Sequence, residues 1–217
     1  MKKAILLANG NAPQKSHLNY FFLQGYETLI CADGGANTAF KLNLEPNFII
    51  GDFDSISNSS IKYFDKKSEF VKISRQNDTD VEKALKFLIN KHFTDVILVG
   101  ATGNRLDHTI CNLGIIIKFF YQINISLLHE NSFLSAYNQN VKLKTKVGET
   151  ISIYAFDKAT KIKSFGLKYP LKNVTLPFGE KESTSNVAIK NYVTLEITNG
   201  IVFVIRDFLI LKNYDLF

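Results

Sequence analysis

Short apolar segments alternate with helical patterns between residues 4 and 128. The apolar segments are rich in β-branched or aromatic residues and are bounded by Gly, Asn, Asp or Ser: Ala4–Ala8, Thr28–Ala32, Phe48–Ile50, Phe70–Ile73, Val96–Val99 and Ile125–Leu128. Continuous apolar segments of this kind are typical of strands buried on both faces, as in a parallel sheet. We therefore expect an α/β domain with an open, mostly parallel sheet and helices on both faces.

Two segments between these strands show the periodicity of helices. Apolar residues follow the spacing of one helix face at Val81, Ala84, Leu85, Leu88 and Ile89. Thr79 precedes this segment and Glu82 stands three positions later, which predicts a capping box in which both side chains satisfy free backbone N–H groups. A second helix is expected from about His108 to Tyr121.

The pattern changes after about residue 130. Apolar and polar residues alternate in Val141–Lys144, Thr150–Tyr154, Val193–Ile197 and Ile201–Ile205, which predicts half-buried antiparallel strands. Asn199-Gly200 predicts a tight hairpin between the last two strands. No helical pattern appears in this half, so Phe208–Leu211 is expected to be a last core strand or a subunit interface. The expected organisation is an α/β domain over residues 1–130 and an all-β sandwich domain over residues 131–217.

The composition is that of a soluble globular protein, with 46% hydrophobic and 21% charged residues among 217. No apolar run reaches the ~18 residues of a membrane span. The first apolar segment, Ala4–Ala8, is shorter than the ~7–15 residues of a signal peptide, so we expect a cytoplasmic protein. The two cysteines, Cys31 and Cys111, lie in apolar segments and are expected to be free buried thiols.

The net charge of +6 favours phosphate-bearing ligands in general, whether nucleotides or nucleic acid. The lysines are scattered along the chain and form no polybasic block. We interpret this charge as a solvated surface, and it does not predict nucleic-acid binding.

Polar residues follow four of the predicted strands. Asp33 follows Thr28–Ala32, Asp52 and Asp54 follow Phe48–Ile50, Asp80 comes after Phe70–Ile73, and Arg105 comes after Val96–Val99. Because ligands bind outside the carboxyl ends of the strands in an open parallel sheet, these side chains should meet in one crevice. Carboxylates held close together repel unless a cation neutralises them, and Mg²⁺ prefers carboxylate, phosphate and water oxygens.

Each of these motifs has a structural explanation when it is taken alone. Asp-x-Asp is usually a turn or a cap, Thr79–Glu82 is explained as a capping box, and Arg105 and Asp107 could form a surface ion pair. Their shared position at strand ends is what indicates a site.

The segments together resemble the ordered signatures of the thiamine pyrophosphokinase family. The resemblance is carried by Asp33–Asn37, Gly51–Ser55, Asn77–Asp80 with Lys83–Leu85, Gly103–His108, Gly166–Tyr169 and Ser183–Asn186, and it spans about residues 4–205. Two positions depart from the family's pattern. Asn77 stands where the family often has Asp, and Gly103-Asn104 precedes Arg105 where another common form has two glycines.

The resemblance implies transfer of a diphosphoryl group from ATP to the hydroxyl of thiamine, giving thiamine diphosphate and AMP. It implies a Mg²⁺ site at Asp33, Asp52, Asp54 and Asp80. It also implies that three of these, Asp52, Asp54 and Asp80, are the catalytic carboxylates. Either Asp54 or Asp80 could accept the hydroxyl proton. It implies ATP contacts at Gln76, Thr79, Arg105 and Asp107.

For the acceptor, the resemblance implies thiamine contacts at Ser183, Ser185 and Asn186, with Tyr169 or Phe178 as a stacking surface. It also implies a homodimer in which each thiamine site is shared between two subunits.

Two other functions explain part of the pattern. A nucleotidyl or nucleotide-sugar transferase could use Asp52 and Asp54 to hold a diphosphate, but it leaves Ser183–Asn186 unexplained. A nucleic-acid-binding protein would use the basic charge, and its affinity would fall steeply with salt. It also predicts clustered basic and aromatic residues, which this sequence lacks.

Overall fold

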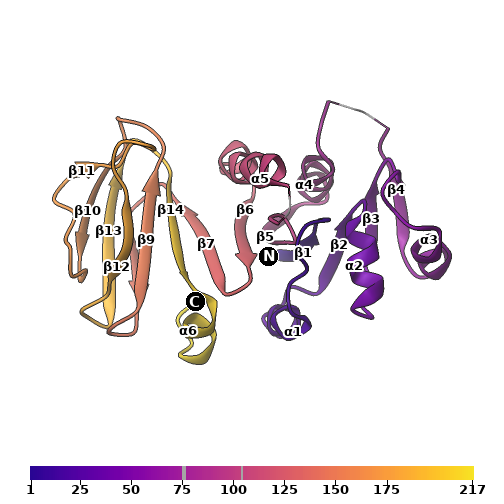
Figure 1. Cartoon of the computed structure of the whole chain (residues 1–217), viewed down its shortest axis with the longest axis horizontal. Coiled ribbons are helices and arrows are strands. Elements are labelled where there is room, and N and C mark those ends of the chain that lie inside the picture. The colour runs from indigo at the N-terminus through magenta and orange to yellow at the C-terminus, as the bar shows by residue number, and fades with distance from the viewer. Residues whose placement is uncertain (75–76, 104) are drawn as a thin grey trace. The chain divides into compact units, whose positions relative to one another are not determined.

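The computed structural model describes residues 1–74, 77–103 and 105–217. Within these ranges the chain divides into two compact units, Met1–Glu130 and Asn131–Phe217 (Figure 1).

The first unit is built on a parallel sheet. Its strands are β1 (Lys2–Leu7), β2 (Thr28–Ala32), β3 (Phe48–Gly51), β4 (Glu69–Lys72), β5 (Phe93–Val99) and β6 (Asn124–His129). They are ordered β6-β5-β1-β2-β3-β4, and every pairing between neighbours is parallel. The predicted apolar segments form these strands; the middle residues of β1, β2, β3 and β5 are almost fully buried, whereas those of the edge strand β4 are half-buried.

Helices connect these strands and cover both faces of the sheet. They are α1 (Lys15–Leu23), α2 (Gly35–Lys41), α3 (Asn58–Phe64), α4 (Asp80–Asn90) and α5 (Leu106–Phe119). Figure 1 shows α1 and α2 on one side of the sheet and α4 and α5 on the other. The predicted α/β architecture is confirmed, and α5 begins two residues before the expected His108.

The second unit is a sandwich of two antiparallel sheets. Its strands are β7 (Ser132–Tyr137), β8 (Val141–Lys144), β9 (Thr150–Ala155), β10 (Lys161–Phe165), β11 (Val174–Thr175), β12 (Ser183–Val187), β13 (Tyr192–Thr198) and β14 (Val202–Asp207). One sheet has the order β12-β9-β14-β7 and the other has the order β11-β10-β13-β8. Alternate residues such as Ile151, Ile153, Leu195 and Val204 form the core between the sheets.

The predicted hairpin at Asn199-Gly200 is wrong. The turn exists, and Asn199 has a φ of +64°. However, β13 pairs with β10 and β8, whereas β14 pairs with β7 and β9, so the turn carries the chain from one sheet to the other. Gly200 permits this passage, because a Cβ there would lie 1.8 Å from Oγ1 of Thr160. The alternating pattern places the apolar faces of both strands in the core but does not say whether the strands share a sheet.

The expectation of a purely β second half is also wrong at its end, because Phe208–Asn213 forms helix α6. Asp207 caps this helix by accepting a hydrogen bond from the backbone N–H of Ile210. Phe208 is fully buried and contacts the rings of Phe133 and Phe217. The apolar residues of this segment therefore pack within their own unit as a helix and not as a strand.

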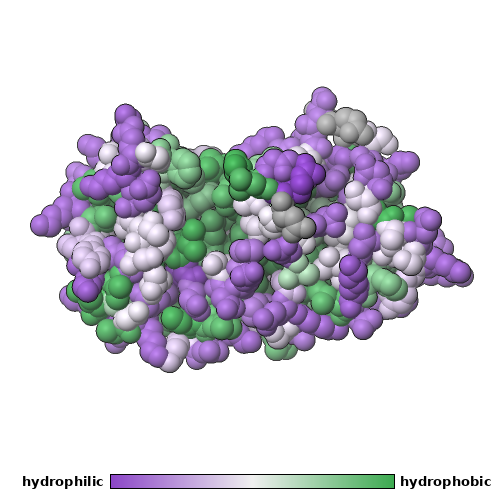
Figure 2. Space-filling model, in the orientation of Figure 1, coloured by the Kyte–Doolittle hydropathy of each residue, from purple (hydrophilic) through white to green (hydrophobic). Residues whose placement is uncertain are grey.

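The surface in Figure 2 is largely hydrophilic, with smaller hydrophobic areas between the polar residues. Among the described residues, none of the helices has both the length and the apolar character to span a bilayer. Both cysteines are free thiols, but only Cys31 is buried. The expectation that Cys111 is buried is wrong, because this residue lies on an exposed position of α5.

Candidate functional site

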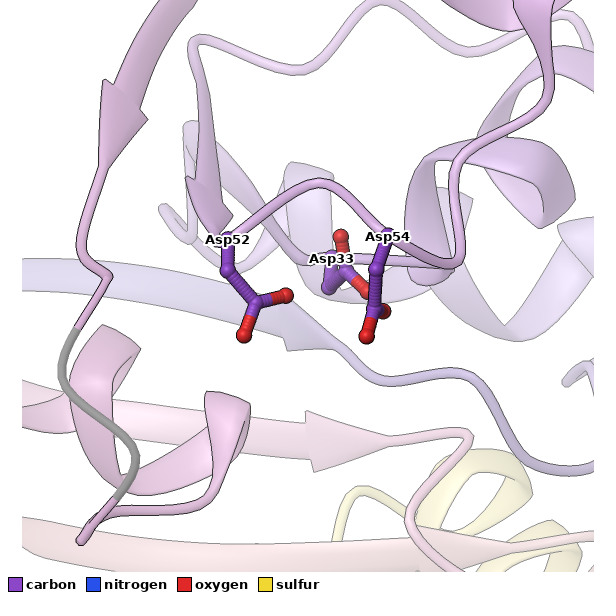
Figure 3. Close-up of side chains that lie close together, drawn as sticks. All are labelled: Asp33, Asp52 and Asp54. Atoms are coloured by element: carbon purple, nitrogen blue, oxygen red, sulfur yellow. The ribbon is translucent and has the colours of Figure 1, made fainter.

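Three carboxylates meet at the carboxyl ends of two neighbouring strands (Figure 3). Asp33 follows β2, whereas Asp52 and Asp54 follow β3. One carboxylate oxygen from each residue lies within 4.8 Å of the other two. The predicted convergence of these three side chains is confirmed.

Left-handed backbone torsions in the two loops direct these side chains toward one another. Phe53 has a φ of +71° and Asp33 has a φ of +41°, both in the left-handed region. The turn at Phe53 brings Asp52 and Asp54 to the same side of the loop (Figure 3). A non-glycine residue in this region carries a strain of about 1–3 kcal/mol, which the surrounding structure must compensate. Gly51 allows the two strand ends to approach, because a Cβ there would lie 2.8 Å from the Cβ of Asp33.

Helix α2 holds the loop that carries Asp52 and Asp54. The Asn37 amide donates a hydrogen bond to the carbonyl oxygen of Ser55 (2.8 Å) and accepts one from the N–H of Ser57 (2.9 Å). Ser55 in turn donates its N–H to Oδ2 of Asp33 (3.2 Å) and its hydroxyl to Oδ1 of Asp54 (2.8 Å). These contacts fix two of the three carboxylates in their orientation.

Asp33 is buried in a way that disfavours its negative charge. Its exposed fraction is 2%, and within the described part of the chain its Oδ1 atom has no hydrogen-bond partner. Burial, assisted by the charges of Asp80 and Asp54, raises the pKa of Asp33 to about 6 even though the Ser55 hydrogen bonds lower it. The donor set and the buried oxygen without a partner fit a hard cation that prefers oxygen ligands.

A buried lysine connects this cluster to α4. The Lys83 ammonium lies 2.9 Å from Oδ1 of Asp80 and 3.4 Å from Oδ2 of Asp52, and the Lys83 side chain is 3% exposed. Burial is the largest influence and would raise the pKa of Asp52, but the charge and hydrogen bond of Lys83 act together with backbone N–H groups of the same loop to lower it. Asp52 is therefore ionised at neutral pH.

The predicted capping box at the start of α4 is confirmed. The Thr79 hydroxyl accepts a hydrogen bond from the N–H of Glu82 (3.2 Å), and the Glu82 carboxylate accepts one from the N–H of Thr79 (3.3 Å). This geometry fixes the first turn of α4 and thereby places Asp80, its first residue.

Arg105 and Asp107 form an exposed ion pair at the start of α5. Nε and Nη2 of Arg105 donate to the two carboxylate oxygens of Asp107 at 2.9 and 2.5 Å, and the two side chains are 67% and 62% exposed. The Arg105 hydrogen bonds hold the pKa of Asp107 well below its usual range. In the preceding loop the Thr102 hydroxyl lies 2.6 Å from Nδ1 of His129, at the end of β6. Gln76 lies outside the described residues.

The second unit contains a cavity of about 310 Å³ beside β12. Three of the predicted thiamine contacts line it: Tyr169, Ser183 and Asn186. The other lining residues are Pro170, Leu171, Val174, Leu176, Lys181, Glu182 and Thr184. The lining therefore combines apolar and polar side chains, a common composition for small-molecule sites.

Asn186 uses its hydrogen-bonding groups within the protein. Its side-chain oxygen accepts from the N–H groups of Tyr169 (3.1 Å) and Val187 (2.9 Å). Its amide nitrogen donates to the carbonyl of Tyr169 (2.7 Å) and the hydroxyl of Ser183 (3.3 Å). An asparagine side chain offers two donor hydrogens and two acceptor lone pairs, so these contacts saturate it. Asn186 thus holds the Tyr169 segment against β12.

Ser185 lies apart from this cavity. The pairing of β12 with β9 shifts between Ser183 and Asn186, and Ser185 adopts a φ of +55° at this irregularity. Its side chain is exposed, and its N–H donates to the Ser152 hydroxyl at 3.0 Å. The structure thus brings Ser183, Asn186 and Tyr169 together at the cavity and does not bring Ser185 to it.

Comparison with protein families matches both units to one family. Residues 22–128 match the model described as "Thiamin pyrophosphokinase, catalytic domain", and residues 138–202 match "Thiamin pyrophosphokinase, vitamin B1 binding domain". The chain belongs to the thiamin pyrophosphokinase family. The carboxylate cluster lies in the catalytic-domain match, and the cavity beside β12 lies in the vitamin B1-binding match.

Individual thiamin pyrophosphokinases support this membership over most of the chain. Thiamin pyrophosphokinase 1 of Caenorhabditis elegans is 29% identical over 195 residues, covering 82% of this chain and 78% of the relative. Thiamine pyrophosphokinase of Bacillus subtilis is 26% identical over 185 residues, covering 82% of this chain and 86% of the relative.

Solved structures share the fold. A thiamin pyrophosphokinase family protein from Enterococcus faecalis has a TM-score of 0.80 at 21% identity, covering 95% of this chain and 99% of that one. Yeast thiamin pyrophosphokinase has a TM-score of 0.84 at 18% identity, covering 98% of this chain and 89% of that one.

Lys83 contacts this carboxylate cluster, but the sequence assigned it no role. It belongs to the segment that carries the family resemblance, and the signal that could have revealed it is its spacing. Residues three apart on a helix are neighbours, so Lys83 lies beside Asp80 and faces the same cluster.

Proposed function

We propose that this chain transfers the terminal diphosphoryl group of ATP to the hydroxyl of thiamine, forming thiamine diphosphate and AMP. The observation that carries this proposal is the match of both units, in order, to the catalytic and vitamin B1-binding domains of one enzyme family. The carboxylate cluster supplies the chemistry that the first of these domains requires.

In this reaction the hydroxyl oxygen of thiamine attacks the β-phosphorus of ATP. A new P–O bond forms to thiamine, the bond between the β-phosphorus and the oxygen that bridges to the α-phosphorus breaks, and AMP leaves with that oxygen. Phosphoryl-type transfer depends mainly on in-line positioning and on neutralising phosphate charge. Fixed, charged side chains on rigid strand ends therefore suit it better than a nucleophilic residue would.

We propose Asp33, Asp52 and Asp54 as the residues that would hold Mg²⁺, with Asp80 beside them. Their mutual distances and the buried Oδ1 of Asp33 support this assignment. When bound, the ion would neutralise phosphate charge and orient the diphosphate for attack. Asp54 and Asp80 remain the two candidates for accepting the proton of the thiamine hydroxyl.

We propose Arg105 and Asp107 as ATP contacts at the start of α5, together with Thr79 and Gln76. The planar guanidinium of Arg105 can hold two phosphate oxygens at once, and it is exposed beside Asp107 at the start of the helix. Thr79 would act through the first turn of α4, because its hydroxyl already caps that helix.

For thiamine, we propose that Ser183 and Tyr169 contact the substrate, that Asn186 keeps them in place, and that Ser185 contributes from the adjacent exposed position. The exposure of Tyr169 (61%) and Phe178 (70%) supports an active homodimer in which a second subunit covers the acceptor. We assign the reaction to the cytoplasm, where ATP is made and where free thiols such as Cys111 remain reduced.

The direct test measures AMP formation from ATP and Mg²⁺ with and without thiamine. We expect AMP to form only when thiamine is present, and to be lost in Asp54→Asn, which removes one carboxylate from the cluster. Thiamine-independent release of inorganic pyrophosphate would instead support a nucleotidyl transferase and contradict the proposal.

A further inference from the structure

Lys83 lies between two carboxylates that come from different parts of the first unit. Its ammonium contacts Asp80 on its own helix (2.9 Å) and Asp52 on the loop after β3 (3.4 Å). The side chain is 3% exposed, compared with 19% for Asp52 and 36% for Asp80. The buried Lys83 ammonium is therefore part of the carboxylate site and is not a surface charge.

The charge of Lys83 is stable where it lies. Its ammonium lies within hydrogen-bonding distance of two carboxylates, and this pairing compensates for the burial of the charge. Among the described residues, the site therefore combines the three clustered carboxylates and the neighbouring Asp80 with the buried ammonium of Lys83 before any ligand binds.

Two neighbouring acidic residues, Asp78 and Glu82, form ion pairs with other lysines. Lys86 pairs with Asp78 at 2.7 Å and Lys118 pairs with Glu82, and these two lysines are 41% and 55% exposed. The buried lysine is the one directed at the carboxylates of the candidate metal site. Lys86 provides a matched control, because it has the same charge and lies on the same helix, three residues later.

We propose that Lys83 is a built-in counter-ion that holds Asp52 and Asp80 and keeps the affinity of the empty site for free divalent cations low. The cation then binds tightly only together with the phosphates of ATP. This inference rests on the proposed function, because it takes the carboxylate cluster to be the Mg²⁺–ATP site. The physical reason is that a unit charge within a few ångströms of a divalent cation opposes its binding strongly where burial limits screening.

The experiment titrates Mn²⁺ alone into nucleotide-free protein and measures bound metal by electron paramagnetic resonance. Removing the lysine charge in Lys83→Met should tighten Mn²⁺ binding by about tenfold or more, as expected for loss of a nearby like charge. Lys83→Arg keeps the charge and should remain within about threefold of the parent protein. Lys86→Met loses the same charge at a more exposed position and should also remain within about threefold.

A purely structural role for Lys83 predicts the opposite result, since a loosened site would bind Mn²⁺ more weakly. Unchanged or weaker binding in a Lys83→Met protein with native circular dichroism would overturn the proposal, as would equal tightening in Lys86→Met. If Lys83→Met does not fold, Lys83→Gln tests the same charge with a polar side chain. The titration needs no turnover, so failure of the thiamine-dependent AMP assay would count against the proposed function and not against this result.

Discussion

At the scale of single residues, Asp33 lies in an environment that destabilises the folded first unit. The residue is buried beside other carboxylates, has a left-handed backbone and keeps one oxygen without a protein partner among the described residues. A carboxylate with only a structural role would be paired. The strain and the buried charge are understandable if a cation completes the site.

The raised pKa of Asp33 makes the stability of the metal-free protein depend on pH. Its folded pKa is about 6, above the ordinary aspartate value of 3.8, mainly because of burial. The stability associated with this group is therefore fully present below pH about 4 and is lost as pH rises through about 6. Asp33→Asn removes the ionisation, so the variant should gain Tm relative to the parent between pH 4 and pH 7.

Thermal unfolding of both proteins in the presence of a chelator, at several pH values, measures this difference. Parallel Tm–pH curves for parent and variant would show that Asp33 is not ionising in this range. The same substitution should lower turnover, because it removes one proposed ligand of the cation.

The residues of the site could be predicted from the sequence, but the backbone torsions and hydrogen bonds that orient them could not. Asp33, Asp52 and Asp54 could be placed together because strand ends of a parallel sheet share an edge. The φ of Phe53, which turns Asp52 and Asp54 to one side, leaves no signal in the sequence because it occurs at a non-glycine residue. The saturation of Asn186 depends on a bulge in β12 and on the path of the Tyr169 segment, which are tertiary features.

At the scale of elements, β12 places two adjacent residues, Ser185 and Asn186, in different environments. Asn186 is buried and fastens the Tyr169 segment through both ends of its amide, whereas Ser185 is exposed. Asn186→Ala should lower the free energy of unfolding by about 1–3 kcal/mol, because buried backbone groups lose their partners. Ser185→Ala should leave stability within about 0.5 kcal/mol of the parent.

Chemical denaturation of the two variants tests this difference, and calorimetry with thiamine gives the consequence for binding. We expect weaker thiamine binding in Asn186→Ala, because Tyr169 loses its support. Equal stability of the two variants would show that the Asn186 hydrogen bonds do not hold the segment.

The helices and turns differ in how well the sequence pattern alone predicts them. Helix α4 was predictable because its capping box and its apolar stripe are both local. Helix α6 was missed because its six residues are too few to display helical periodicity. The Asn199-Gly200 turn was correctly located, but strand pairing on either side of it is set by packing between sheets.

At the scale of the whole molecule, the proposed homodimer predicts complementation between a variant defective in catalysis and a variant defective in thiamine binding, assayed at low thiamine concentration. If each acceptor site uses the catalytic unit of one subunit and the sandwich of the other, a mixed dimer contains one doubly defective site and one intact site. Exchange between Asp54→Asn subunits and Ser185→Ala/Asn186→Ala subunits should then restore about a quarter of wild-type sites, since half of the dimers are mixed. Light scattering gives the oligomeric state, and a monomer or an absence of recovered activity would rule out shared sites.

In the proposed reaction the diphosphoryl group moves as one unit from ATP to thiamine. The most direct measurement uses ATP that carries an isotopic label in the β-phosphate, with Mg²⁺ and thiamine, and follows the label in the products. We expect labelled thiamine diphosphate and unlabelled AMP in equal amounts. Formation of ADP with thiamine monophosphate, or release of labelled inorganic pyrophosphate, would contradict it.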